Sequence, residues 1–215
     1  MIRNIFLYLD RTYILKNPPL QPLWDLGLAL FRDALMRNVE ISHNAVDNLL
    51  VLIDRYRDKD QVSTKLIYDS VGMFVSLNVY LTVFEAPFLA RAKEYYTLRA
   101  QKHVGEIVNS GDRGRVDNYL RYISTCLVQE ETNASSGGYL DPCTKKSLLG
   151  IVETSLLTNC STEILSGVHA FLKNGNISEL KLLFELYKRV KLLPALQSKF
   201  SEYVTVLFIN VENWI

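Results

Sequence analysis

Apolar residues recur along nearly the whole chain with the spacing of amphipathic α-helices, and almost no segment alternates as a β-strand does. Val46, Leu49, Leu50 and Ile53 follow the spacing i, i+3, i+4, i+7. Residues at this spacing lie on one face of a helix, since an α-helix completes a turn in about 3.6 residues. Three further stripes of this kind are Ile67, Val71, Phe74 and Val75; Leu180, Leu183, Phe184 and Tyr187; and Leu196, Phe200, Tyr203, Val204 and Leu207. The pattern predicts an all-α protein.

Prolines, glycines and small polar residues separate these helical stretches. The prolines at 18–19 end the first helix, because a residue that precedes proline disfavours the α region. Pro87 lies near the start of a longer helix, which we expect over about 79–108. Two glycines make 110–114 the clearest linker, and the serines and glycines of 132–138 predict a loop.

Three serines stand where a helix is expected to begin: Ser42, Ser63 and Ser178. A serine hydroxyl at an N-cap accepts a hydrogen bond from an otherwise unpaired backbone N–H, so we expect all three to be caps. The run at 203–211 is rich in β-branched residues, as strands are, but the apolar stripe that passes through it favours a helix.

The breaks divide the chain into an N-terminal helix at 1–16 and two modules at 20–108 and 115–215. Together they hold about nine helices with short connections. Stacked helices cover their apolar stripes against one another and form extended scaffolds. The sequence therefore predicts a scaffold of stacked helical bundles.

The charge of the chain argues against two classes of partner. Its 24 basic and 23 acidic residues leave a formal net charge of +1, so no overall field attracts nucleic acid or an anionic membrane. No run approaches the roughly 20 apolar residues that cross a bilayer, and Asp10 and Arg11 interrupt the first apolar stretch, unlike a signal peptide. We expect a protein of the cytoplasm and nucleus that binds neither nucleic acid nor membrane.

No pattern of cysteines or histidines indicates catalysis, a cofactor or a metal. The cysteines include no CxxC pair, so we expect buried or half-buried free thiols. The histidines are far apart, and polar positions on helix surfaces explain them better than ligands or general bases. The residues concerned are Cys126, Cys143, Cys160, His43, His103 and His169. We expect neither a metal nor a cofactor to bind.

Two charged segments are also better explained as solvent-exposed surface than as functional sites. Glu130 and Glu131 are adjacent, and adjacent helical residues point about 100° apart, so a solvated face explains them better than a catalytic pair. Acidic and basic residues alternate over 54–60, which predicts an exposed helix end rather than a nucleic-acid patch. No catalytic residue is therefore assigned, and we expect that the chain is not an enzyme.

Five stretches carry motifs that are informative together. They are IFLYLDRTYI at 5–14, LGLALFRD at 26–33, FEAPFL at 84–89, SGVHAFLKNG at 166–175 and ELKLLFELYKRV at 179–190. In this order they resemble the N-terminal region of cullins, the scaffolds of multi-subunit ubiquitin ligases. The resemblance spans most of the chain, and its strength lies in the order of five motifs rather than in any single one.

The resemblance implies a fold and a function. It implies an arch of stacked cullin repeats of about five helices each. In that frame 1–16 is the last helix of a truncated first repeat, 20–108 is the second repeat, and 115–215 is an incomplete third. It implies a non-catalytic scaffold of a cullin-RING E3 ubiquitin ligase in ubiquitin-dependent protein degradation, which holds a substrate near a ubiquitin-loaded conjugating enzyme.

The resemblance also implies a substrate adaptor as partner. In the family the adaptor binds the second and fifth helices of the first repeat, and only the fifth is present here. Tyr8 and Arg11 carry over as adaptor contacts, with Leu7 a weaker neighbour. Residues three apart share a helical face, and tyrosine and arginine are enriched at binding hot spots. A half-buried core tyrosine and a solvated arginine are the alternatives.

Two adaptor classes fit the motifs. The stretches at 26–33, 84–89 and 166–175 resemble most the cullin class that binds BTB-domain adaptors. The stretch at 5–14 and the Trp24–Asp25 pair also fit the class that uses a β-propeller adaptor. We favour a BTB-type adaptor.

The chain departs from the family pattern in ways that suggest alternative functions. The earlier helices of the first repeat are missing, which should expose Ile5, Leu9 and Tyr13, and the loop at 132–138 interrupts a helix that is continuous in the family. The C-terminal half is also missing, with its modifier-acceptor lysine, so we do not expect a RING-box protein to bind. A truncated cullin-like interaction module, or a decoy without ligase function, is therefore the first alternative. An unrelated helical enzyme is the second.

Overall fold

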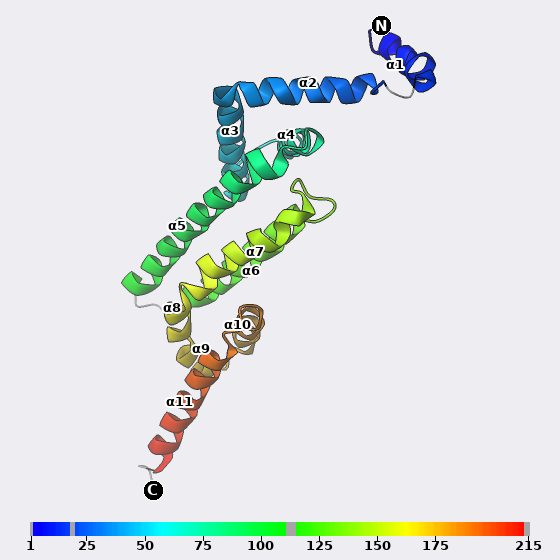
Figure 1. Cartoon of the computed structure of the whole chain (residues 1–215). Coiled ribbons are helices and arrows are strands. Elements are labelled where there is room, and N and C mark those ends of the chain that lie inside the picture. The colour runs from blue at the N-terminus through cyan, green and yellow to red at the C-terminus, as the bar shows by residue number, and fades with distance from the viewer. Residues whose placement is uncertain (1, 18–19, 111–114, 213–215) are drawn as a thin grey trace. The chain divides into compact units, whose positions relative to one another are not determined.

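The computed structural model describes residues 2–17, 20–110 and 115–212, and within these ranges the chain forms helices and no strand (Figure 1). The prediction of an all-α protein is confirmed. The first helices are α1 (Ile2–Thr12), the 3₁₀ turn η1 (Ile14–Lys16), α2 (Leu23–Arg37), α3 (Val39–Arg57), α4 (Thr64–Ser76), the π-helical turn η2 (Tyr80–Glu85) and α5 (Ala86–Ser110). They are followed by α6 (Arg115–Asn133), the 3₁₀ turn η3 (Pro142–Thr144), α7 (Lys145–Glu153), the π-helical turn η4 (Thr154–Thr158), α8 (Ser161–Ser166), α9 (Val168–Asn174), α10 (Ile177–Arg189) and α11 (Leu193–Glu212).

The helices form two compact units, Met1–Phe88 and Leu89–Ile215, and the division falls inside α5. The domain boundaries expected from the sequence, 1–16, 20–108 and 115–215, stay predictions. Most of the expected linker at 110–114 lies outside the described residues.

Aromatic rings hold the first unit together. The Phe84 ring stacks on Phe74 of α4 and on Phe88 of α5, with centroids 5.7 and 5.4 Å apart, and Tyr80 lies 5.3 Å from Phe84. A π-helical turn is wider than an α-helical one, and here it holds Tyr80 and Phe84 in the aromatic core. Pro87 is the second residue of α5, which directly follows this helical turn, so its missing N–H removes one helical hydrogen bond.

The charged end of α3 is not entirely exposed, contrary to the sequence expectation. The Arg57 side chain is only 3% exposed, and its guanidinium carbon lies 5.3 Å from the centre of the Phe88 ring. Its Nη1 atom lies 3.3 Å from a carboxylate oxygen of Asp54. Arg57 is therefore part of the core of the first unit, because its guanidinium can stack on an aromatic face while paired with a carboxylate.

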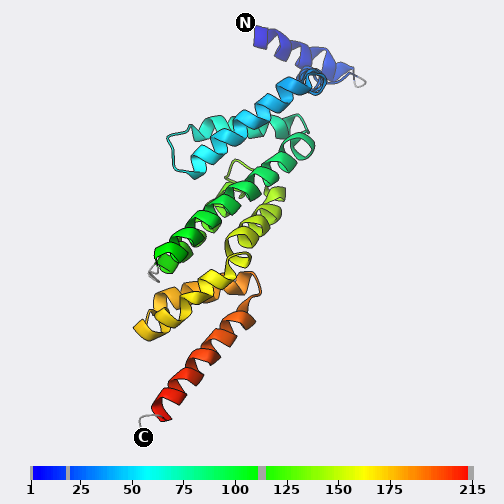
Figure 2. The ribbon, with the colours of Figure 1, turned by 90° about the vertical axis from the view of Figure 1, so that its left-hand side faces the viewer.

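The second unit has a larger apolar core, in which α6 lies beside α7 (Figure 1). Its buried residues come from α5 through α11, and among the largest are Tyr96, Tyr119, Leu120, Ile123, Leu156 and Tyr187. The Tyr119 hydroxyl donates to the Leu156 carbonyl at 2.8 Å, so this ring is buried without losing its hydrogen bond. The last turns of α11 extend away from α8, α9 and α10 (Figure 2).

Glu130 contradicts the expectation of a solvated glutamate pair. Its side chain is completely buried, and its carboxylate accepts from the Tyr96 hydroxyl at 2.6 Å and from the Asn133 amide at 3.3 Å. Glu131, one residue on, lies near the surface and pairs with Lys145 at 2.9 Å. The angle between adjacent helical residues thus separates the two acids, but one of them points into the core.

The helix ends confirm some predictions and correct others. The Ser63 hydroxyl accepts from the Leu66 N–H at 3.3 Å, so this cap is confirmed. Ser42 and Ser178 are not caps, because α3 begins at Val39 and α10 at Ile177, with Asn38 and Asn176 preceding them. The expected loop begins at residue 134, just after α6, and the run at 203–211 is helical as expected.

His103 and Cys143 also differ from expectation. His103 is half-buried, with its ring centre 4.6 Å from that of Tyr122 and 5.3 Å from that of Tyr119. Cys143 is exposed, whereas Cys126 is half-buried and Cys160 buried, and all three are free thiols. A helical stripe predicts a buried face but does not say which polar residues border it.

We predict that Glu130→Ala lowers the free energy of unfolding by about 2–4 kcal/mol, because it leaves two buried donors without their acceptor and opens a cavity. Glu130→Gln retains a side-chain oxygen as acceptor and should lower it by less than about 1.5 kcal/mol. Chemical denaturation measures both. Glu131→Ala is the matched control and should change stability by less than about 0.5 kcal/mol, since its ion pair is exposed. Equal effects of Glu130→Ala and Glu131→Ala would contradict the structure.

We predict that the second unit loses stability as the pH falls below about 6.5. Burial lowers the pKa of His103, and nearby Lys102 and Arg99 lower it further, whereas Glu106 opposes the shift. Below the ordinary histidine pKa of 6.5 the unfolded chain therefore binds a proton more readily than the folded one, which favours unfolding. His103→Phe, which keeps a ring between the tyrosines, should flatten the dependence of the melting temperature on pH. An equal dependence on pH in the wild type and in His103→Phe would contradict this role of His103.

Candidate partner-binding surface

A hydrogen bond between two helices positions α1. The backbone N–H of Leu23, the first residue of α2, donates to a carboxylate oxygen of Asp10 at 2.8 Å. The first N–H groups of a helix have no partner within it, and Pro22 provides no side-chain cap. Asp10 therefore caps α2 from the neighbouring helix, and its negative charge suits the positive end of the helix dipole.

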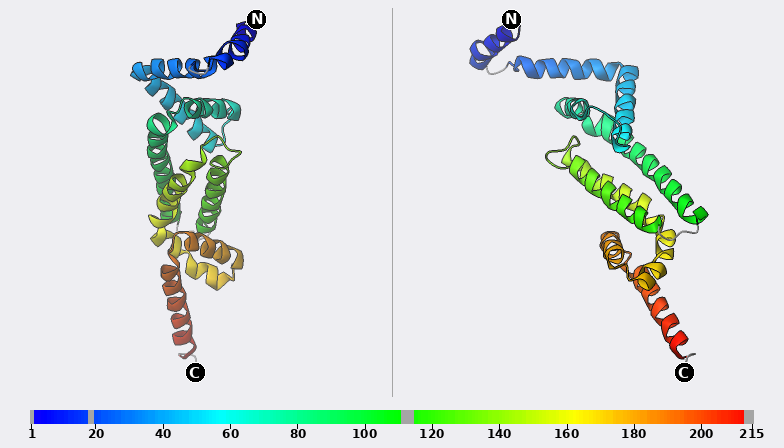
Figure 3. Two further views of the ribbon diagram at one scale, coloured as in Figure 1. Left: turned by 45° about the vertical axis from the view of Figure 1, so that its right-hand side comes forward. Right: turned by 180° about the vertical axis from the view of Figure 1, so that it is seen from behind.

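An apolar groove lies between α1 and α2. It has a volume of about 690 Å³. Its lining residues are Phe6, Leu7, Asp10, Leu23, Trp24, Leu26, Gly27 and Leu30. Both views of Figure 3 show α1 beyond the N-terminal end of α2. Leu7 thus faces α2 across this groove.

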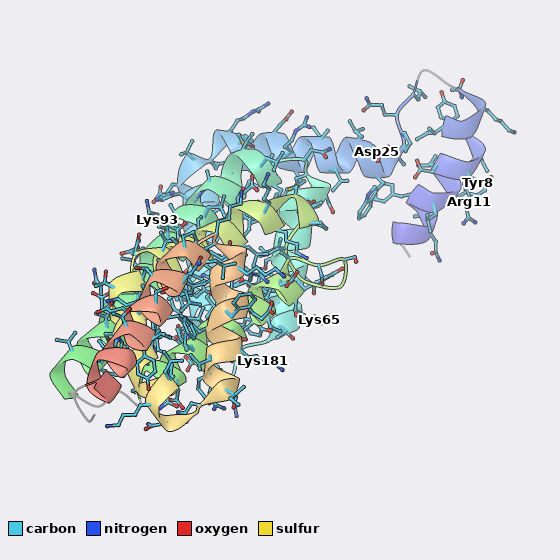
Figure 4. The ribbon with its side chains drawn as sticks, turned by 90° about the horizontal axis from the view of Figure 1, so that it is seen from below. Tyr8, Arg11, Asp25, Lys65, Lys93 and Lys181 are labelled. Carbon is cyan, nitrogen blue, oxygen red and sulfur yellow. The ribbon has the colours of Figure 1, made fainter. Side chains whose placement is uncertain are left out.

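Tyr8 and Arg11 lie on another side of the same helix. Tyr8 is 67% exposed, and Arg11 is exposed as well. Figure 4 shows both side chains on the side of α1 that faces away from α2. The structure therefore places Tyr8 and Arg11 together and separates them from Leu7. Tyr8 is not a half-buried core residue, and its role in binding stays a prediction.

Much of the apolar surface of α1 and α2 is uncovered. Ile5, Leu9 and Tyr13 are 53%, 40% and 59% exposed, as the sequence predicted. Of the described residues of α2, only Leu35 is buried. Exposed apolar surface on this scale is typical of sites that bind other proteins.

The described residues contain no group of three or more histidine, cysteine, aspartate or glutamate side chains that could hold a metal ion. Within the same ranges, no helix is both long and apolar enough to span a bilayer. The uncovered apolar surface of α1 and α2 is the candidate site.

The fold and the exposed first helices define a helical-repeat protein with a candidate binding surface on α1 and α2. A family model described as the cullin alpha solenoid domain matches residues 1–213. Cullin-4A of Homo sapiens is 34% identical over 219 residues, and Cullin-4A of Mus musculus is 35% identical. Cullin-3 of Dictyostelium discoideum is 29% identical over 199 residues. The chain belongs to the cullin family.

The match covers 99% of this chain but only 28% of either Cullin-4A, and 88% of the chain against 25% of Cullin-3. The chain thus spans little more than a quarter of the length of these relatives. Family membership agrees with the expectation of a helical scaffold that is not an enzyme.

Sequence reasoning missed the groove between α1 and α2. Leu23, Leu26 and Leu30 follow helical spacing, so the apolar face was visible in the sequence. The spacing of a stripe does not say whether another helix covers it, and the lining from α1 comes from residues more than a dozen positions away. Asp10 was seen only as a break in an apolar run, because its partner is the backbone of α2.

We predict that Asp10→Ala loosens α1, because it removes the cap of α2 and the hydrogen bond that joins the two helices. The expected loss is about 1 kcal/mol of local stability, which corresponds to roughly fivefold faster amide exchange. Hydrogen exchange should show the change at Leu23 and across α1, with α4 unaffected. Asp33→Ala, also on α2, is the control and should leave α1 unchanged. Unaltered exchange at Leu23 in Asp10→Ala would contradict the assigned cap.

Proposed function

We propose that this chain is the adaptor-binding part of a scaffold in a cullin-RING E3 ubiquitin ligase, acting in ubiquitin-dependent protein degradation. The observation that carries the proposal is the exposed pair of Tyr8 and Arg11 on one side of α1, at positions that match the adaptor contacts of the family. An exposed aromatic ring beside a guanidinium provides the apolar area and the directional donors that dominate protein interfaces.

The attachment of α1 to α2 supports this role. Asp10 joins the two helices through one hydrogen bond, and Tyr8 and Arg11 lie on the helix attached in this way. A contact surface that is ordered before binding loses less entropy when the partner arrives. A scaffold accelerates a reaction by holding the reactants close together, which requires such ordered attachment at each end. We also propose the cytoplasm and nucleus as its location.

The proposed adaptor is a BTB-domain protein, with a β-propeller adaptor as the alternative. The motifs at 26–33, 84–89 and 166–175 support the BTB class. The stretch at 5–14 fits both classes. The relatives named Cullin-4A match this chain with higher identity than the Cullin-3 of Dictyostelium discoideum does, which supports the β-propeller adaptor. The binding experiment therefore includes one adaptor of each class.

A second candidate function is that of an interaction module or decoy that competes for adaptors without ligase function. The loop that follows α6 at residue 134, where the family helix is continuous, favours it. A contiguous coding segment that continues into the rest of a cullin would overturn this second candidate.

We predict that Tyr8→Ala and Arg11→Ala each lower the affinity for the adaptor by about tenfold or more, as truncation of a hot-spot residue does. Titration calorimetry with a purified BTB-domain adaptor and with a purified β-propeller adaptor measures the affinity and identifies the class. Tyr13→Ala is the matched control, because this tyrosine is also exposed but follows α1 on a different face. Equal binding by the wild type and all three variants would count against the Tyr8–Arg11 surface.

A further inference from the structure

A second groove lies on the other side of α2, between α2 and α4. It has a volume of about 440 Å³. Leu28, Met73 and the buried Leu77 contribute apolar surface to its lining. Three exposed aromatic side chains also line it: Trp24 (73% exposed), Phe31 (50%) and Tyr68 (56%). Nothing in the Tyr8–Arg11 surface contributes to it.

Asp69 is the only charged side chain among the residues that line this groove. It is exposed, and in the described part of the chain no ion pair or hydrogen bond engages its carboxylate. The groove therefore combines aromatic side chains, an apolar lining and one negative charge.

This combination matches the chemistry of a basic side chain. A cation is attracted to the electron-rich face of an aromatic ring, and most strongly to tryptophan. The aliphatic stem of lysine or arginine can lie along apolar surface while its charged end reaches a polar group. Arginine suits the groove better than lysine, because its planar guanidinium both stacks on rings and pairs with a carboxylate through two hydrogen bonds.

We propose that the groove between α2 and α4 binds an arginine side chain, flanked by apolar residues, from a peptide segment of a partner protein. The charge of Asp69 and the three aromatic rings select the cation, and Leu28, Met73 and Leu77 accept the apolar neighbours. This is a second recognition site, distinct from the Tyr8–Arg11 surface, and it does not depend on the adaptor proposed above.

Gly72 provides a way to block the groove without disturbing the fold. It lines the groove from within α4, and a Cβ atom placed on it would meet no atom within 4 Å. Gly72→Leu therefore adds a side chain in open space and replaces a poor helix former with a good one. Gly150, on α7, is equally open, so Gly150→Leu is a matched control outside the groove.

The binding test uses the full chain carrying Trp214→Phe, which leaves Trp24 as the only tryptophan. The probes are the capped tripeptide leucine-arginine-leucine and its analogue with citrulline, which has nearly the shape of arginine without its charge. We expect the arginine peptide to shift the Trp24 indole resonance saturably and to bind about fivefold or more tighter than the citrulline peptide. Asp69→Asn should abolish this preference, and Gly72→Leu should abolish binding.

Two controls make the test decisive. Gly150→Leu should bind as the parent does, and thermal melts should show that every variant is folded. Equal binding of the two peptides, no binding of either, or an arginine preference that persists in Asp69→Asn would overturn the proposal. Sedimentation equilibrium provides a further check. A dimer that Gly72→Leu dissociates would assign the groove to a second copy of the chain and would also overturn it.

Discussion

Every helix of this chain must cover its apolar face with another helix, since the described residues form no sheet against which it could pack. Burial of that face is the main source of stability, because isolated helices of this length are marginal in water. In the second unit this requirement is met. The stripes of α5 to α11 converge on one core, where Tyr119 and Tyr187 are completely buried. The polar groups that enter this core, such as Glu130, do so with hydrogen-bond partners.

The same requirement is not met at the N-terminal end of the first unit, and this leaves apolar surface exposed there. α3 and α4 bury their stripes around Ile53, Ile67 and Phe74. α2, however, buries Leu35 alone among its residues and leaves Trp24 exposed between two grooves. One groove faces α1 and the other faces α4. Both grooves expose apolar surface that the described helices leave uncovered.

The residues whose burial was predicted wrongly from the sequence are polar residues in the interiors of the two units. Glu130 was expected in solvent, but Tyr96, 34 positions earlier, provides a hydroxyl that makes its burial possible. Arg57 was expected at an exposed helix end, but Phe88 provides a ring for its guanidinium. His103 is half-buried because Tyr119 and Tyr122 of the next helix flank it. In each case the deciding partner is distant in sequence, and a polar residue is buried only where such a partner exists.

The sequence by itself determined the fold class, the stripes that form the cores, and membership of the cullin family, because helical periodicity and ordered motifs are local properties of the chain. It also identified Tyr8 and Arg11 as one face of a helix, since that follows from spacing alone. Only the tertiary structure decided that Asp10 caps α2, that Leu7 faces a groove away from Tyr8, and that Trp24, Phe31, Tyr68 and Asp69 share another. These facts depend on how separate helices pack. Packing is set by contacts between residues that are far apart in the sequence, and a local sequence pattern does not indicate which of them meet.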